Sequence, residues 1–297
     1  MISVIIVNYN TSKLTLDCIA SLREHTTGVS YEIIVVDNAS PADAMLPQLK
    51  ALDGITFVQS DENLGFGKAN NLGLLHAKGE YIFFLNSDTI LLNNALKLFL
   101  DYAEQNADKH VGAVGAMLQN RAGEEIHSYG HFPTFSEQCR KLIITPVQKL
   151  FRRNTGIVAE AVIGSEATVD YVTGADLFVR RAVLDECGAF HPAFFMYYEE
   201  TEMQHRFQQH GYSSHIIRGP RIIHLEGESV KGNGQSQFLR DTLRQERSLR
   251  IYFRLTMPRA EYLLFRIVYP LMRQTLWLNP HVSFKDKWQL MKVIFSR

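Results

Sequence analysis

Amide and carboxylate side chains come directly after three apolar stretches near the start of the chain. They are Asn8-Tyr9-Asn10, Asp37-Asn38-Ala39-Ser40 and Asn86-Ser87-Asp88. If the stretches are parallel strands, all three groups lie at the carboxyl edge of one sheet, where open α/β sheets bind ligands. An Asx turn would explain any one group alone. Their recurrence at three strand ends therefore indicates a polar binding site.

The strand-end groups favour a nucleotide ligand but not the common nucleotide-binding loops. A carboxylate such as Asp37, at a strand end, could hold ribose hydroxyls or a base edge. No Gly-x-Gly-x-x-Gly sequence follows the first apolar stretch, and no Gly-x-x-x-x-Gly-Lys-Ser/Thr sequence is present. The usual dinucleotide fold and a P-loop hydrolase are therefore disfavoured.

A pair of carboxylates, Glu199 and Glu200, begins a predicted helix in the second half of the chain. Glu200 shares a helix face with Met203 and Phe207, so we expect it to point inward and Glu199 to be rotated away. A carboxylate base within reach of a hydroxyl typically contributes about 10²–10⁴-fold to a rate. Acidic residues also favour helix N-termini through the macrodipole, which is sufficient to explain Glu202.

The elements that must position these residues alternate along the chain. Near-continuous apolar strands separated by helices predict a doubly wound, mostly parallel α/β sheet. The predicted strands are 2–7, 32–36, 55–58, 81–85, 111–118, 169–172, 176–179 and 213–217. The predicted helices begin near 12 and 41 and span about 66–78, 93–106 and 199–211.

Composition bounds the class of protein. The 297 residues have a formal net charge of zero, and the three cysteines form no Cys-x-x-Cys pair. We therefore expect neither a zinc site nor a disulfide framework. A reducing cytoplasmic environment fits these cysteines, and we expect no nucleic-acid partner. The N-terminus does not resemble a signal peptide, and no apolar run approaches the ~18 residues of a membrane span.

Two segments depart from the regular pattern. Residues 120–170 show no sustained hydrophobic periodicity, which is typical of a lid or binding loop. The tail, 233–297, is predicted to be helical and mixes aromatic with basic residues; from Arg250 onward it carries nine Lys/Arg against Glu261 and Asp286. Such a tail either lies in a membrane interface or packs on the core as terminal helices, and the sequence leaves both alternatives open.

Ordered motifs over roughly residues 1–230 resemble family 2 glycosyltransferases, most closely the rhamnosyltransferase-like branch of bacterial surface polysaccharide synthesis. Each motif alone is weak, and the specificity lies in their order. They are Val-Asn-Tyr-Asn (7–10), Val-Val-Asp-Asn-Ala-Ser (35–40), Asn-Leu-Gly-Phe-Gly-Lys-Ala-Asn-Asn (63–71), Phe-Leu-Asn-Ser-Asp-Thr (84–89), Val-Thr-Gly-Ala-Asp (172–176), Phe-Phe-Met-Tyr-Tyr-Glu-Glu-Thr-Glu (194–202) and His224.

The resemblance implies a GT-A fold, Rossmann-like, over residues 1–232, with 120–170 on the acceptor side. Asp88 would be the metal ligand of an Asp-x-Asp-type motif in which Asn86 takes the first position, and His224 would be a second ligand. Mg²⁺ or Mn²⁺ prefers oxygen-rich shells completed by phosphates and water. A lone histidine is more often a surface or packing residue, and only its place after the strand 213–217 and before Glu226-Gly227 favours this role.

The resemblance also implies the residues that hold the donor and remove the proton. The donor site would comprise Asn8, Asn10, Asp37, Asn63, Gly65, Lys68, Asn71, Asn86, Ser87, Gly174 and Asp176. The family usually has Glu-Asp where this chain has Glu199-Glu200, so Glu200 is the predicted base, with Glu199 in reserve. Asp176 replaces a small or apolar residue and is expected to affect substrate preference.

The expected activity is inverting, metal-dependent transfer of a hexose-type sugar from a dTDP- or UDP-sugar to a saccharide, lipid-linked in our interpretation. The enzyme would be cytoplasmic or peripheral on the inner face of the cell membrane. One alternative is a non-catalytic nucleotide-sugar or glycan-binding protein on the same fold, because fold does not fix function. A nucleotidylyltransferase is disfavoured, since Asn8-Tyr9-Asn10-Thr11 lacks the Gly-rich basic loop that it would need.

Overall fold

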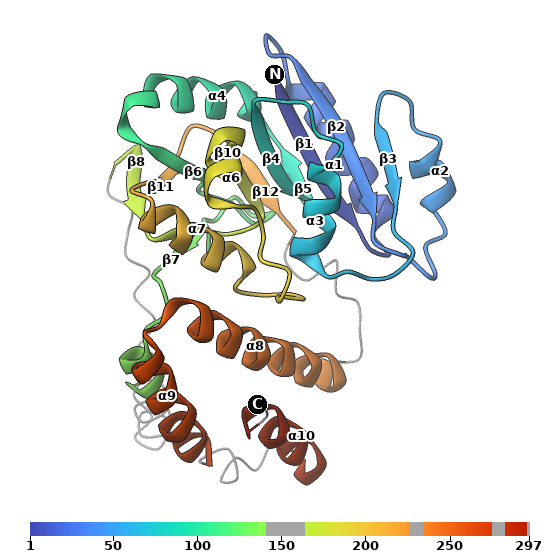
Figure 1. The fold of residues 1–297 in the computed structure, drawn as a ribbon. Coiled ribbons are helices and arrows are strands. Elements are labelled where there is room, and N and C mark those ends of the chain that lie inside the picture. Colours follow the sequence, from blue (N-terminus) through green and yellow to red (C-terminus); the bar gives the residue numbers. More distant parts are fainter. Residues whose placement is uncertain (141–163, 226–233, 275–282, 296–297) are drawn as a thin grey trace. The chain divides into compact units, whose positions relative to one another are not determined.

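The computed structural model describes residues 1–140, 164–225, 234–274 and 283–295. These residues form two compact units (Figure 1). The first unit comprises residues 1–131 and 164–225 and contains the sheets. The second comprises 132–140, 234–274 and 283–295 and is helical.

The first unit is built on an eight-stranded sheet with the order β3-β2-β1-β4-β10-β6-β11-β8. β1 pairs in parallel with β2 and β4. β10 runs antiparallel to its neighbours β4 and β6. The edge strand β8 runs antiparallel to β11. The predicted doubly wound, mostly parallel sheet is therefore confirmed. The strands are β1 (Ile2–Asn8), β2 (Tyr31–Asp37), β3 (Thr56–Gln59), β4 (Tyr81–Asn86), β6 (Val111–Ala116), β8 (Glu166–Val169), β10 (Asp176–Arg180) and β11 (Ser213–Ile217).

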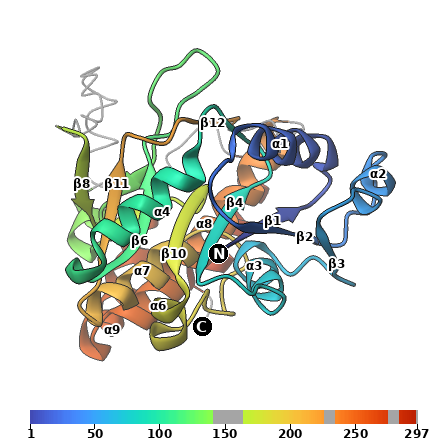
Figure 2. The same cartoon turned by 90° about the horizontal axis from the view of Figure 1, so that it is seen from above.

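Helices cover both faces of this sheet (Figure 2). On one face lie α1 (Ser12–His25) and α4 (Ala95–Gln105); on the other lie α3 (Phe66–Leu74), α6 (Arg181–Cys187) and α7 (Glu199–Gln209). Successive side chains of a strand point to opposite faces, so Val4 and Ile6 join the core under α1, whereas Ile5 meets α3 at Gly73. This double burial is why the strands read as continuous apolar runs.

Four features differ from the sequence-based expectation. The helix expected from Pro41 is α2 (Leu46–Lys50), because the Asp43 carboxylate bonds the backbone amides of Ser12 and Met45 and holds a turn there. α3 ends at Leu74 instead of Lys78. The strand expected at 169–172 is divided between β8 and β9 (Tyr171–Val172), which pairs with β7 (Tyr129–Gly130). α6 and the small sheet of β5 (Thr89–Leu91) and β12 (Ile222–His224) were not predicted.

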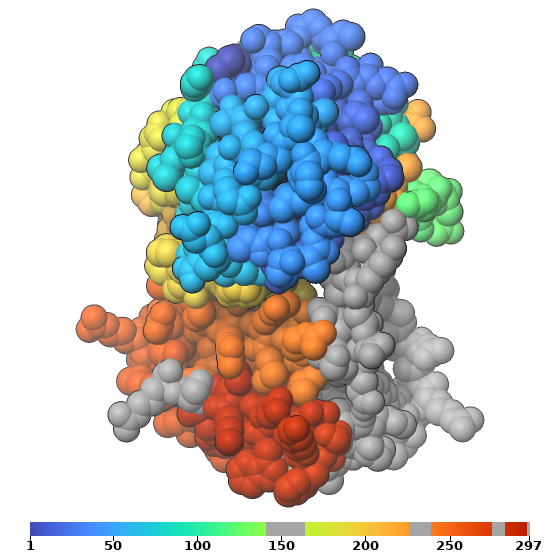
Figure 3. Space-filling view, turned by 90° about the vertical axis from the view of Figure 1, so that its right-hand side faces the viewer, coloured from blue at the N-terminus to red at the C-terminus, as the bar shows by residue number. Residues whose placement is uncertain are grey.

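The second unit contains α8 (Gly234–Thr256), α9 (Arg259–Met272) and α10 (Phe284–Phe295), as expected for a helical appendage. α8 and α10 lie side by side (Figure 3). Aromatic rings form the core of the second unit. The ring centroids of Phe253 and Phe265 are 4.7 Å apart, and those of Phe265 and Tyr269 are 4.8 Å apart. None of the helices within the described ranges has the length and hydropathy of a membrane-spanning helix.

Candidate active site

The tips of β1 and β2 carry a closed network of polar side chains around Asp37. Asn8 and Asp37 are register partners, and both are fully buried. The Asp37 carboxylate accepts hydrogen bonds from Asn8 Nδ2 (2.7 Å), Ser40 Oγ (2.6 Å) and Gln59 Nε2 (2.6 Å). Asn10 is exposed, and its Oδ1 accepts the amide of Ala42 (3.2 Å). The predicted donor residues of these two strands therefore lie together, with Asp37 already bonded by its own chain.

The loop before α3 is folded around the side chain of Asn38. Asn38 Nδ2 donates to Asn63 Oδ1 (3.1 Å), and Asn38 Oδ1 accepts the amide of Leu64 (2.8 Å). Gly65 has φ +82°, and a Cβ there would stand 2.0 Å from the carbonyl oxygen of Phe195. Only glycine fits this conformation and this close approach. The glycine therefore joins the loop before α3 to the loop before α7.

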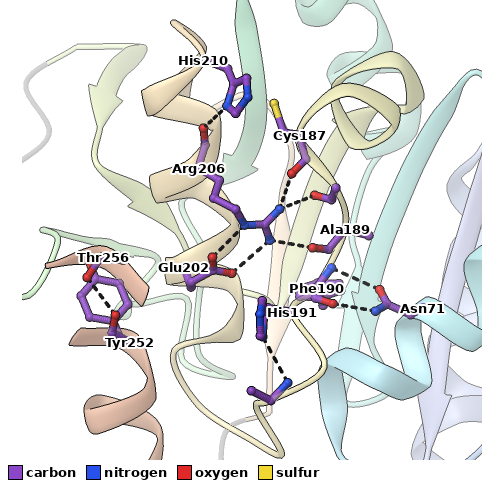
Figure 4. A network of polar contacts seen from close by, with 12 residues as sticks. Asn71, Cys187, Ala189, Phe190, His191, Glu202, Arg206, His210, Tyr252 and Thr256 are labelled. Carbon is purple, nitrogen blue, oxygen red and sulfur yellow. Dashed lines mark hydrogen bonds and ion pairs between the residues drawn. The ribbon is translucent and has the colours of Figure 1, made fainter. Parts of the chain in front are cut away.

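Two other predicted donor residues lie on α3. Lys68 is half-buried. Asn71 Nδ2 donates to the carbonyl of Phe190 (2.7 Å), and its Oδ1 accepts the Phe190 amide (3.2 Å) (Figure 4). The structure thus gives Asn71 a positioning function, since it fixes the segment that leads to Glu199 and Glu200.

The tip of β4 brings the two predicted metal ligands together. β5 pairs with β12, and this pairing places His224 opposite Thr89. His224 Nε2 lies 3.2 Å from Asp88 Oδ1 and 3.4 Å from Asn86 Nδ2. Ser87 Oγ lies 3.1 Å from Thr11 Oγ1, which ties the β4 tip to the start of α1. A small sheet that the sequence did not predict therefore creates this pair.

The Asp88–His224 pair fits an octahedral Mg²⁺ or Mn²⁺ ion. Ligands in adjacent positions of such a shell, each ~2.1 Å from the metal, are about 3 Å apart. The 3.2 Å between the Asp88 oxygen and the His224 nitrogen is close to that separation. Within the described part of the chain, no group of three or more His, Cys, Asp or Glu could hold a metal. Two protein ligands leave positions for diphosphate oxygens and water, which Mg²⁺ commonly keeps.

Backbone contacts connect the β4 tip to the predicted base. The amide of Asn86 donates to the carbonyl of Ala175 (2.9 Å). The adjacent residue, Gly174, is so close to α7 that a Cβ on it would stand 3.8 Å from Glu200 Cβ. Asp88 and Glu200 are therefore linked through one short segment, 174–175.

The prediction that Glu199 is rotated away from the core is wrong. Glu199 is 2% exposed, and its Oε2 is a buried atom without a hydrogen-bond partner, whereas Glu200 is only half-buried. The face argument fails because α7 is enclosed on several sides: Glu199 lies beside Gly67 of α3, and Glu202 is also buried. Burial and the neighbouring Glu200 carboxylate raise the pKa of Glu199 well above its usual range, and burial also raises the pKa of Glu200.

Asp176 lies inside the sheet at the start of β10. It is fully buried, and its Oδ2 accepts the amide of Ala116 (2.7 Å), while its Oδ1 has no hydrogen-bond partner. Burial raises the pKa of Asp176 well above its usual range, against the hydrogen bond from Ala116. Its predicted effect on substrate preference stays a prediction, and the position implies an indirect effect through the 174–176 backbone.

Sequence reasoning missed Arg206, which fixes the loop before α7 (Figure 4). Its guanidinium makes a bidentate pair with Glu202 (2.7 and 3.0 Å) and donates to the carbonyls of Cys187, Gly188 (2.9 Å) and Ala189 (2.6 Å). The spacing of four residues between Glu202 and Arg206 was the available signal. It also suits an ordinary surface pair, so only the structure reveals the buried contacts.

Backbone strain lies directly before Glu199. Tyr197 and Tyr198 have φ values of 73° and 67°, and each such left-handed residue costs roughly 1–2 kcal/mol. Strain of this kind persists only where surrounding contacts hold it. Here the loop is held by Arg206, by Asn71 and by the hydrogen bond from the Phe66 amide to the Phe195 carbonyl (2.9 Å). This arrangement is typical of a preorganised functional site.

A small cavity of about 160 Å³ lies elsewhere, at the amino end of β6. Its lining includes Asn106, His110 and Tyr212 and contains none of the predicted site residues. Of the segment predicted to face the acceptor, residues 141–163 lie outside the described ranges, and 120–140 and 164–170 are divided between the two units.

The chain matches known glycosyltransferases. The model of glycosyl transferase family 2 matches residues 3–154, half of the chain. The chain belongs to this family and is a glycosyltransferase, as its motifs predicted, and the prediction of an enzyme is confirmed.

The chain is similar to curated hexosyl- and rhamnosyltransferases. It is 28% identical over 213 residues to the low-salt glycan biosynthesis hexosyltransferase Agl10 of Haloferax volcanii, covering 69% of this chain and 61% of that protein. It is 21% identical to the N-acetylglucosaminyl-diphospho-decaprenol L-rhamnosyltransferase of Mycobacterium tuberculosis, covering 67% of each. The match thus spans less than two thirds of Agl10.

Solved structures share the fold. The mannosyltransferase PcManGT of Pyrobaculum calidifontis, in complex with GDP-Man and Mn²⁺, superposes with a TM-score of 0.59 at 18% identity, covering 97% of this chain and 78% of that chain. This likeness confirms the predicted GT-A fold.

Proposed function

We propose that this glycosyltransferase moves one hexose-type sugar, with inversion, from a dTDP- or UDP-sugar to a lipid-linked saccharide during cell-surface polysaccharide synthesis. The observation that carries the proposal is the arrangement of Asp88 and His224, 3.2 Å apart, one short backbone segment away from Glu200. A cation site and a carboxylate base are the two groups that such a transfer needs. The relative whose name includes a diphospho-decaprenol acceptor supports the lipid-linked class.

Asp88 and His224 would hold Mg²⁺ or Mn²⁺, which neutralises charge on the departing nucleoside diphosphate. Glu200 accepts the proton of the acceptor hydroxyl. The hydroxyl oxygen then bonds to the anomeric carbon on the face opposite the diphosphate, and the bond from that carbon to the diphosphate oxygen breaks. A pKa raised by burial makes the Glu200 carboxylate a stronger base than an exposed glutamate.

The deciding experiment compares Glu200→Gln and Glu200→Asp with the unaltered protein. The glutamine variant should lose about 10²–10⁴-fold in kcat and keep its Kd for the nucleotide sugar, because a base acts on the acceptor. The aspartate variant should retain much more activity. Calorimetry with Mn²⁺ and a panel of dTDP- and UDP-sugars measures Kd, and nucleotide release with saccharide acceptors measures kcat. Tight donor binding with no turnover in the unaltered protein would instead favour a non-catalytic binder.

A lipid-linked acceptor places the reaction at a membrane surface. We therefore propose the inner face of the cell membrane as the place of action and the basic C-terminal helices as the contact. No part of this proposal requires a spanning helix.

A further inference from the structure

Helix α9 carries two apolar faces. Phe265 and Tyr269 are buried in the core of the second unit. On the other side, Leu263, Ile267 and Leu271 are 59%, 64% and 62% exposed, and Leu264 beside them is 52% exposed. At 3.6 residues per turn these four side chains fall within an arc of about 100°. A helix that is apolar on opposite faces is normally covered on both.

Helix α10 exposes a second apolar face, made of aromatic residues. Phe284, Trp288 and Phe295 are 69%, 51% and 53% exposed, and their spacing of four and seven residues places them on one side of the helix. Leu290 and Ile294 are buried on its other side. α10 therefore has two apolar sides: one is buried in the core of the unit, and the other, which is aromatic, is in contact with solvent.

Cationic residues border both exposed faces. Arg259 and Arg266 are exposed next to the α9 face, and Lys285 and Lys292 are exposed next to the α10 face. From Arg250 to Arg297 the chain carries nine Lys/Arg against two acidic residues. A second copy of this surface would bring like charges together, which disfavours self-association. An anionic surface is the complementary partner.

We propose that the exposed faces of α9 and α10 bind the surface of an anionic lipid bilayer. Aliphatic and aromatic side chains enter the region between headgroups and acyl chains, and the bordering arginines and lysines contact the anionic headgroups. Tryptophan is suited to this boundary because its ring is apolar and carries one polar N–H. The described helices do not meet the requirements for spanning, so they would lie along the surface. This inference deepens the membrane contact proposed above.

The test is sedimentation of the full chain with vesicles of phosphatidylcholine alone or mixed with phosphatidylglycerol, without donor or acceptor. We expect binding to the mixed vesicles only. The triple variant Leu263→Gln/Ile267→Gln/Leu271→Gln should lower affinity at least about tenfold, since three apolar side chains leave the bilayer. Lys285→Gln/Lys292→Gln should lower it about fivefold for each charge removed. Because all five residues are exposed, the melting temperature should not change.

Leu75→Gln is the matched control, because Leu75 is 80% exposed but lies in the first unit; it should bind vesicles like the unaltered protein. In a Trp277→Phe background, Trp288 fluorescence should shift to shorter wavelength with mixed vesicles. No vesicle binding, equal binding by the triple variant, or a concentration-dependent dimer that the triple variant abolishes would overturn the proposal. Loss of sugar transfer is a separate result, because the vesicle assay contains no substrate.

Discussion

His224 Nε2 and Asp88 Oδ1 lie 3.2 Å apart although they come from distant parts of the chain. The antiparallel pairing of β5 with β12 is the cause, since it ends at the register partners Thr89 and His224. Strand pairing is much stiffer than a loop, so the pair is held in place before any ligand binds. A preorganised pair of this kind suits a cation.

Asp88→Asn should abolish tight Mn²⁺ binding and lower kcat by about 10²–10³-fold, the range for removing one group that stabilises developing charge. His224→Gln should weaken Mn²⁺ binding similarly. Electron paramagnetic resonance of free Mn²⁺, in the presence of nucleoside diphosphate, measures binding apart from activity. Asp61→Asn removes an exposed carboxylate and should behave like the unaltered protein. If Asp88→Asn binds Mn²⁺ normally, the metal assignment is wrong.

Stability should depend on pH through Glu199. Its pKa in the folded protein is raised by burial, so the folded state binds the proton more tightly than the unfolded state. Stability is therefore highest at low pH and decreases as the pH rises from the unfolded pKa to the raised folded value. Glu199→Gln removes this cost, and we expect the melting temperature to rise by about 2–4 °C near pH 8, which is ~1 kcal/mol for a domain of this size.

The gain from Glu199→Gln should shrink near pH 5, where the folded protein already carries the proton. Calorimetric melting at both pH values checks the sign. An equal gain at both would mean that the charge of Glu199 is not the cause.

Arg206→Met should cost about 3 kcal/mol or more, because it leaves the buried Glu202 carboxylate without its cation. The loop of residues 187–198 should loosen, so kcat should fall even in the folded fraction. Urea denaturation and steady-state kinetics measure the two effects. The matched control is Arg218→Met, whose ion pair with Glu125 is exposed and should contribute only about 0–1 kcal/mol. Equal losses in the two variants would argue against a positioning role for Arg206.

Gly65→Ala should destabilise the protein and weaken donor binding, because its Cβ would collide with the Phe195 carbonyl. Gly123 has nearly the same φ, +79° against +82°, but open space around it. Gly123→Ala should therefore show only the conformational cost, roughly 1–2 kcal/mol. Thermal melting measures the stability of the two variants, and calorimetric titration measures their affinity for the donor. A Gly65→Ala variant that behaves like Gly123→Ala would contradict the close contact.

Most strands and helices of the first unit could be predicted from the sequence, because they depend on residues that are neighbours in the chain. Continuous apolar strands and the polar groups after β1, β2 and β4 follow from neighbouring residues. β5 and β12 were not readable, because each has only three residues and is defined by its partner. The same is true of the division at Asp170, where β8 and β9 pair with different sheets.

The candidate site shows the same division. The order of the family's motifs singled out Asp88, His224 and Glu200 as candidates, and their functions stay predictions. Helix periodicity misjudged Glu199, because a face argument assumes one buried side and α7 is enclosed on several. Arg206 was missed since its three carbonyl partners carry no side-chain signal.

The sequence by itself determined the α/β class and the family, and it supplied the candidate residues for binding a cation or taking a proton, because these depend on hydrophobic period, local order and the succession of motifs. Only the tertiary structure decided that Asp88 meets His224, that Asn71 and Arg206 hold the loop before α7, and that α9 and α10 leave apolar faces exposed. The physical reason is that distances between remote residues and the burial of a helix face depend on packing, which no local pattern specifies.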